Sequence, residues 1–113
     1  MKHLLSALAI LPGTIAYNQN TLNIPTTITS TNINLTLQGG TTTFYQGVTT
    51  NTMGANGSLL GPTVIMNQGD YVNITVDNQL GEPTTLHWHG LHVKPEDDGG
   101  PHSVILPNET WNP

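Results

Sequence analysis

Residues 71–77 read Tyr71-Val72-Asn73-Ile74-Thr75-Val76-Asp77. The three aliphatic side chains of this stretch alternate with polar ones, which is the two-residue period of a strand with one buried face. The same period recurs at residues 33–37, where Ile33 and Leu35 alternate with Asn34. No helical periodicity follows the first residues of the chain. The pattern therefore predicts an all-β domain.

Working outward from this stretch, turn-forming residues separate further strand-like segments about every ten residues, which is typical of a β-sandwich or barrel. Gly39-Gly40 is expected to form a turn, and the Gly- and Asn-rich residues 51–61 a loop. The apolar run at 63–66 predicts a buried strand. Strands are expected at residues 33–37, 41–45, 63–66, 72–76, 84–89 and 109–111. Because the last of these stops at Pro113, we expect the final strands of the fold to be missing.

Composition restricts the possible functions. The 113 residues leave room for one small domain. Seven Asp and Glu against two Lys give a formal charge of −5, and no basic run is available to neutralise phosphates, so nucleic-acid binding is not expected. Cys is absent, which rules out disulfides and thiolate metal sites in this chain. A metal would have to be held by His, carboxylate or Met side chains.

The N-terminal residues indicate an exported protein. In residues 1–16, Lys2 precedes an apolar stretch that ends in small residues, as in a short secretory signal peptide. The stretch falls short of the roughly 20 apolar residues that span a bilayer, so no stable membrane insertion is expected. We expect a periplasmic or secreted protein, with residues 17–30 as an extended lead-in and residues 31–113 as the domain proper.

The residues with the clearest chemistry are His87 and His89, which flank Trp88. On a strand, residues i and i+2 project from the same face about 6 to 7 Å apart, so both imidazoles can face one metal ion or two neighbouring ions. Neutral imidazole suits copper and zinc. Gly90 leaves space beside the pair, and the acidic loop at 96–101 can supply a supporting carboxylate. The spacing alone is shared by zinc hydrolases, although no third ligand at a suitable distance in the sequence is evident.

Other side chains of metal-binding type have simpler explanations. His92 and His102 are expected to be exposed loop histidines. Trp88 is expected to pack in the core behind the histidine pair. Met53 and Met66 are expected to serve packing, not copper binding.

The chain resembles the first cupredoxin (plastocyanin-like) domain of multicopper oxidases, in the branch of bacterial laccases and cuprous oxidases. The resemblance runs from about Leu22 to Pro113. It rests on Gly61-Pro62-Thr63, Gly69-Asp70, Asn78-Gln79-Leu80, the run Thr84 to Leu91 with its His-Trp-His-Gly element, and Asp98-Gly99-Gly100-Pro101. It implies a cupredoxin-like Greek-key β-sandwich, present here in part, which full-length members combine with further cupredoxin domains.

The resemblance also implies roles for individual residues. His87 matches the ligand of the type 2 copper, and His89 matches a ligand of the type 3 copper pair. Asp98 matches an acidic residue that assists proton delivery to bound oxygen. Asp97 is the nearest rival for that role, and an ordinary solvated turn carboxylate is the alternative for Asp98. The further histidine pairs of the family's trinuclear cluster, and the Cys of its type 1 copper, are not found in this chain.

The resemblance implies that the parent protein oxidises a reducing substrate one electron at a time and reduces dioxygen to water at a trinuclear copper cluster. Phenols and cuprous, ferrous or manganous ions all remain candidate substrates. The 113-residue chain alone is expected to be inactive. The alternative is a cupredoxin-like scaffold without enzymatic activity, used for copper storage or protein interaction.

Overall fold

The computed structural model describes residues 22–113, and nearly all of its regular structure is strand. The strands are β1 (Thr27–Ile28), β2 (Asn32–Tyr45), β3 (Val48–Ala55), β4 (Thr63–Val64), β5 (Asn73–Asn78) and β6 (Thr110–Trp111). The single helical element of residues 22–113 is the short 3₁₀ turn η1 (Pro95–Asp97). The prediction of an all-β fold is confirmed.

The expected signal peptide, residues 1–16, lies outside the described residues, as do residues 17–21 of the expected lead-in. The described remainder of that lead-in contains β1. Between Leu22 and Pro113, no helix is long and apolar enough to cross a lipid bilayer.

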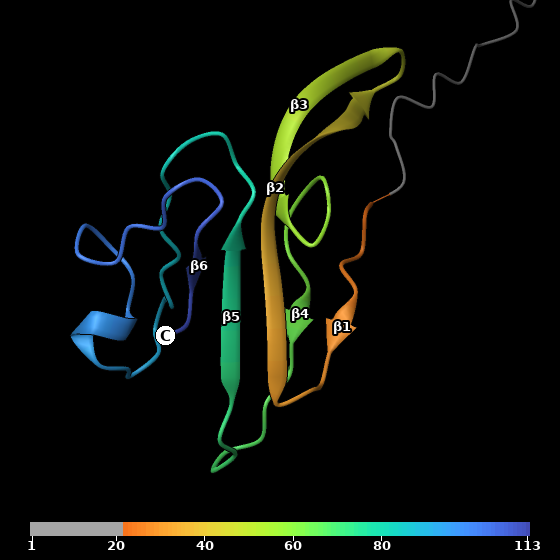
Figure 1. The fold of residues 1–113 in the computed structure, drawn as a ribbon. Coiled ribbons are helices and arrows are strands. Elements are labelled where there is room, and N and C mark those ends of the chain that lie inside the picture. The colour runs from red at the N-terminus through yellow and green to blue at the C-terminus, as the bar shows by residue number, and fades with distance from the viewer. Residues whose placement is uncertain (1–21) are drawn as a thin grey trace, which may run out of the picture.

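The strands form two sheets (Figure 1). β1 and β4 pair in parallel as a small sheet, while the larger sheet has the order β3-β2-β5-β6. At its centre β2 and β5 run parallel, and their register aligns Ile33 with Ile74 and Leu35 with Val76. The two segments in which apolar and polar residues alternate clearly are therefore neighbouring central strands. Their apolar residues lie opposite one another.

The core is small and lies where the two sheets meet. Its buried members are Ile33, Leu35, Val76 and Ile105, each at most 7% exposed. Partly buried side chains from β1 and β4 pack against this cluster. Trp88 and Trp111 do so too, and their rings stack with centroids 6.2 Å apart. Burying an aliphatic side chain of this size contributes roughly 1.5–3 kcal/mol, so the few members of this cluster hold the described sheets together.

One polar side chain is buried with this core. Asn78, at the end of β5, has no exposed surface. Its amide nitrogen donates to the carbonyls of Glu82 and Ile105, both at 2.9 Å, and its amide oxygen accepts from the backbone N–H of Leu80, also at 2.9 Å. The amide nitrogen and the amide oxygen of Asn78 thus both have hydrogen-bond partners, as burial of a polar group requires.

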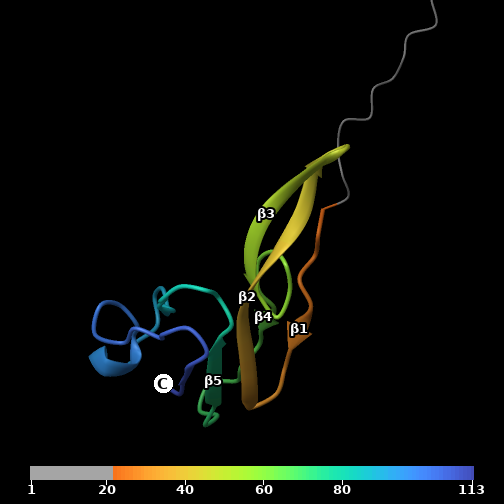
Figure 2. The same cartoon turned by 45° about the horizontal axis from the view of Figure 1, so that its top comes forward.

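The expected turn at Gly39-Gly40 is wrong. β2 runs through both glycines, which pair with residues of β3, and the chain reverses further along at Gly47, where φ is +78°. Gly40 serves close packing instead, because a Cβ there would lie 2.5 Å from the Cβ of Ser58. The long β2–β3 hairpin consequently extends beyond the other strands (Figure 2).

Two further expectations need correction. β3 occupies most of the first half of residues 51–61, so the loop there is shorter than predicted. The strand at 63–66 ends at Val64, because its partner β1 is only two residues long. Ile65 and Met66 are 54% and 45% exposed, and Met53 is 58% exposed, so neither methionine packs in the core of the described chain as expected.

We predict that Asn78→Ala destabilises the fold by about 2 kcal/mol, because the partly buried Glu82 carbonyl and Leu80 N–H lose their side-chain partner and the buried Ile105 carbonyl keeps only its bond from Thr84 N–H. Asn73→Ala is the matched control on the same strand. Its side chain is exposed and bonds only to the Asn32 side chain, so its cost should stay within about 0.5 kcal/mol. Urea unfolding followed by Trp fluorescence measures both. Equal costs for the two variants would contradict the role given to Asn78.

Candidate functional site

The histidine pair lies on an irregular segment, so the strand predicted for residues 84–89 is wrong beyond its first residue. Thr84 alone pairs as a strand does, exchanging backbone hydrogen bonds of 3.0 and 2.8 Å with Ile105. The chain then turns at the far end, where Leu91 N–H donates to the Trp88 carbonyl at 3.1 Å. Between these points no described strand pairs with the segment, and its backbone-bonded neighbour is the acidic turn, residues 95–103.

The expected relation between the two imidazoles survives without a strand. The ring centroids of His87 and His89 lie 6.0 Å apart, with the ring planes 84° to one another. Both side chains are exposed, while Leu86 and Trp88 are half-buried against the core, as expected for Trp88. The segment therefore keeps its alternation of inner and outer residues and presents both imidazoles outward.

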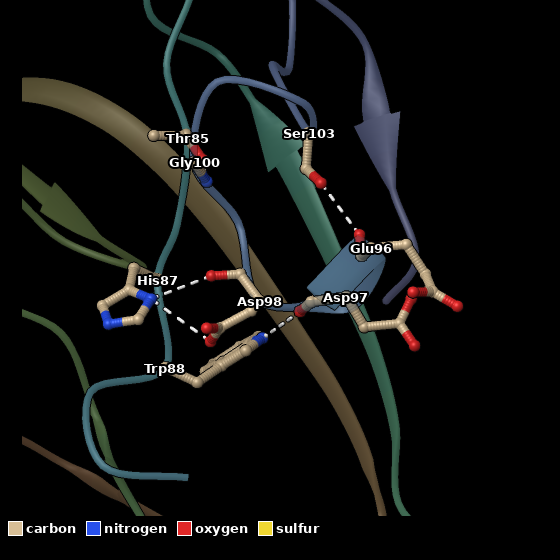
Figure 3. Close-up of polar contacts among 8 residues, drawn as sticks. All are labelled: Thr85, His87, Trp88, Glu96, Asp97, Asp98, Gly100 and Ser103. Carbon is tan, nitrogen blue, oxygen red and sulfur yellow. Dashed lines mark hydrogen bonds and ion pairs between the residues drawn. The ribbon is translucent and has the colours of Figure 1, made fainter. Parts of the chain in front are cut away.

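The acidic turn meets this segment with its backbone carbonyls (Figure 3). Three consecutive carbonyls accept hydrogen bonds from side chains. That of Glu96 accepts from the Ser103 hydroxyl at 2.8 Å. Those of Asp97 and Asp98 accept from Trp88 Nε1 and His87 Nδ1, each at 2.9 Å. The turn is thereby fastened both to itself and to the histidine segment.

The bond to the Asp98 carbonyl defines the state of the His87 ring. A carbonyl oxygen can only accept, so Nδ1 must carry the proton, and in the neutral ring Nε2 then has the free electron pair. Metal-binding histidines commonly have their other nitrogen held in this way, which fixes the tautomer and the ring orientation. Nε2 of His87 is thus left available as a donor to a metal ion.

The carboxylate of Asp98 lies beside the same nitrogen. Its Oδ1 is 3.2 Å from His87 Nδ1, but the single proton of Nδ1 is already used by the Asp98 carbonyl. Oδ1 is itself buried and has no hydrogen-bond partner among the described residues. Figure 3 shows the carboxylate of Asp97 directed away from His87. Of the two rival carboxylates, Asp98 is therefore the one next to the histidine.

A further contact, missed in the sequence, holds the acidic turn against the histidine segment. Gly100 N–H donates to the Thr85 hydroxyl at 2.7 Å. Gly99 has a φ of +73°, and a Cβ there would collide with the Leu86 carbonyl group. The adjacent glycines were the available signal, because glycine permits both a positive φ and close backbone approach.

These residues fit a copper ion as donors but do not complete its coordination. Imidazole nitrogen is a ligand that copper favours, and the pair offers two exposed rings. In residues 22–113, however, no group of three His, Cys, Asp or Glu side chains is arranged to hold a metal. His92 and His102 are exposed on loops, as expected. A copper site here would need ligands from elsewhere.

A hollow of about 800 Å³ adjoins Trp88, and its lining includes Met66, Tyr71 and Leu91. Neither His87 nor His89 is part of that lining. The hollow and the outward face of the histidine pair are therefore separate features of the surface.

Comparisons with known proteins point to one family. A family model described as multicopper oxidase matches residues 36–113. Multicopper oxidase mco of Staphylococcus aureus is 51% identical over 75 residues, which make up 66% of this chain and 17% of that protein. Cell division protein FtsP of Sodalis glossinidius is 42% identical over 79 residues, 70% of this chain and 17% of that protein.

A solved structure leads to the same family. It is that of CueO from Ochrobactrum sp., described as a bacterial laccase-like multi-copper oxidase, which superposes with a TM-score of 0.78 at 41% identity. The match covers 82% of this chain and 22% of the other. The present chain thus corresponds to a small part of the length of its relatives.

We predict that Gly99→Ala displaces the acidic turn while Gly100→Ala does so far less. Both glycines have a positive φ, so both variants carry a backbone cost of roughly 1–2 kcal/mol. Only at Gly99 does the added Cβ also meet another group, since nothing lies within 4 Å of a Cβ at Gly100. Hydrogen exchange of the Trp88 indole N–H reports the difference and should accelerate markedly in Gly99→Ala alone. Equal protection in both variants would refute the close contact.

Proposed function

The chain belongs to the multicopper oxidase family, and on that premise we propose that residues 31–113 form the first cupredoxin domain of a longer copper-dependent oxidoreductase. Its all-β fold is cupredoxin-like, as in the solved relatives. The observation that carries the proposal is the outward His87–His89 pair, in which the Asp98 carbonyl leaves Nε2 of His87 free for a metal.

The proposed reaction couples one-electron oxidation of a reducing substrate to the reduction of dioxygen to water. Copper, when bound, supplies the one-electron redox chemistry, and the protein supplies ligands, geometry and protons. The relative from Ochrobactrum is described as having oxidase activity towards lignin model compounds and lignosulfonate. That description supports phenols as the substrate class to test first, ahead of reducing metal ions.

We assign His87 to the type 2 copper and His89 to one of the type 3 pair. The exposure of both rings and the 6.0 Å between their centroids support two separate ions, one for each imidazole. The remaining ligands, and the type 1 copper with its thiolate, would come from the rest of the parent protein, because this chain contains no Cys.

We assign Asp98 to proton transfer toward the histidine pair. Its Oδ1 is buried, has no partner among the described residues and lies beside the ring that would bind copper. Because Oδ1 lies beside Nδ1 and the metal would bind at Nε2, a proton held by Asp98 would reach a group bound at the copper through an intervening water. Asp97 is the weaker candidate because its carboxylate points elsewhere.

The rest of the parent protein is the proposed partner of the exposed apolar surface. Tyr71, Leu91 and Val93 are 91%, 52% and 41% exposed, and all three line the hollow beside Trp88. Apolar patches of this kind mark contact surfaces. We propose that the remaining cupredoxin domains cover them, and that the protein is exported.

A non-enzymatic scaffold is the second candidate, and one observation favours it. A relative at 42% identity is named for cell division and not for an oxidase. Both histidines are nevertheless present here, and the His87 ring is oriented by the Asp98 carbonyl, which a scaffold without copper would not require. Copper binding and oxygen consumption by the parent protein distinguish the two.

We predict that the copper-loaded parent protein consumes oxygen when given a phenolic substrate. The 113-residue chain alone should show neither oxygen uptake nor intense blue absorption, since it has no Cys to form the copper–thiolate bond. An oxygen electrode and a visible spectrum provide both measurements. A parent protein that binds copper fully yet consumes no oxygen would favour the scaffold.

We predict that His87→Ala and Asp98→Asn fail in different ways in the parent protein. His87→Ala removes a ligand, so type 2 copper should be depleted and oxygen uptake should collapse. Asp98→Asn keeps the size of the side chain but loses the carboxylate, so copper content should stay near wild type while turnover falls roughly a hundredfold.

Copper stoichiometry measured alongside oxygen uptake separates the two effects. His102→Ala, at an exposed loop histidine, is the control for the first variant, and Asp97→Asn is the control for the second. Normal turnover in Asp98→Asn with slow turnover in Asp97→Asn would transfer the proton role to Asp97.

A further inference from the structure

We propose that Thr85 is a positioning residue for His87: its hydroxyl anchors the acidic turn so that the Asp98 carbonyl holds the imidazole with Nε2 free for copper. This inference rests on the proposed function, because it concerns the same copper ligand. Thr85 itself would not touch the metal, and it acts only through the turn.

The contacts between the two segments form an ordered series. Thr84 pairs with Ile105 through the backbone, and Thr85 then bonds to Gly100 at 2.7 Å. His87 bonds to Asp98 and Trp88 bonds to Asp97, each at 2.9 Å (Figure 3). Residue numbers rise on one side and fall on the other, as in an antiparallel pair. From Thr85 onward, the donors and acceptors on the histidine side are side chains.

In this series the Thr85–Gly100 bond lies between the Thr84–Ile105 backbone pair and the His87–Asp98 bond. One residue, Leu86, separates Thr85 from His87, and one residue separates Gly100 from Asp98. The intervening Gly99 lies directly against the Leu86 backbone. A short span on each side means that fixing Gly100 leaves Asp98 little freedom to move away from His87.

Near Gly100, no other described hydrogen bond of the acidic turn joins it to the histidine segment. The bonds from the Ser103 hydroxyl to Glu96 and from Ser103 N–H to Gly100 lie within the turn, so they preserve its shape but not its place. Gly99 and Gly100 bring no side chains to the contact. If the Thr85 hydroxyl is lost, Gly100 N–H loses its acceptor, and the turn beside Asp98 is then held to the histidine segment mainly by the Trp88–Asp97 bond, which lets the Asp98 carbonyl shift from Nδ1.

Such a shift would weaken copper binding without removing a ligand. The His87 ring would no longer be restricted to the Nδ1–H tautomer and to one orientation. Loss of an outer partner that orients a metal-binding histidine typically lowers metal affinity about 10- to 100-fold. The inference therefore predicts an effect on affinity from an exposed threonine that no copper would contact.

The test compares Thr85→Val, Thr85→Ser and Thr84→Val in the parent protein. Valine has the shape of threonine without its hydroxyl, and serine keeps the hydroxyl. Thr84 is the matched control, because its described hydrogen bonds are made by its backbone. The probe is copper alone, with the type 2 signal measured by electron paramagnetic resonance during titration with a chelator. The ¹⁵N spectrum of copper-free, histidine-labelled protein reports the tautomer of His87.

Thr85→Val should lower the affinity of the type 2 copper about 10- to 100-fold and populate the Nε2–H tautomer of His87. Thr85→Ser and Thr84→Val should resemble wild type in both respects. Wild-type affinity in Thr85→Val overturns the positioning role, and so does an equal loss in Thr85→Ser or Thr84→Val. If Thr85→Val does not fold, Thr85→Ala removes the same acceptor with less bulk and is judged by the same outcomes.

This result is separable from the proposed function. A wild-type parent protein without any type 2 signal would overturn the assignment of His87 as a copper ligand. A wild-type protein with that signal, beside an unaffected Thr85→Val, would overturn only the role of Thr85.

Discussion

The buried amide of Asn78 is the constraint on which the arrangement of the site depends. Its three hydrogen bonds join the end of β5 to Leu80, Glu82 and Ile105. The chain after Glu82 leads into the histidine segment, and Ile105 follows the acidic turn and pairs with Thr84. One side chain therefore fixes the points at which both halves of the site leave the sheet. Because the Asn78 side chain is fully buried, water cannot easily replace its bond to Ile105, and the constraint is strong.

From those fixed points the two halves are joined mainly by side chains bonded to backbone groups. This arrangement differs from the backbone hydrogen-bond ladder between two paired strands. A strand ladder would occupy the N–H and C=O groups of both segments and would leave the side chains unconstrained. Here the bonds use the rings of His87 and Trp88, so the contact that joins the segments also sets the orientation of the ring that we propose as a copper ligand.

The sequence predicts the central strands well because their burial follows a simple period. Residues 33–37 and 72–76 alternate strictly, and both lie in central strands with the expected side buried. It fails where a glycine has a tertiary role. Gly40 is locally typical of a turn, yet glycine is needed there because Ser58, far along the chain, packs against it.

Residues 84–89 also alternate, but a strand requires a partner backbone, and only Thr84 has one. The period predicted which face His87 and His89 share, and nothing local could show that Thr85 binds Gly100.

The position of the histidine pair also indicates how the rest of a copper cluster would be added. Leu86 and Trp88 turn toward the core while His87 and His89 turn outward, so additional ligands must approach from the exposed side of the pair. The hollow beside Trp88 has a different lining, which includes neither His87 nor His89. Ligand donation and apolar packing are thus assigned to two different surfaces of one small domain. A partner domain that covers the hollow need not be the one that completes the metal site.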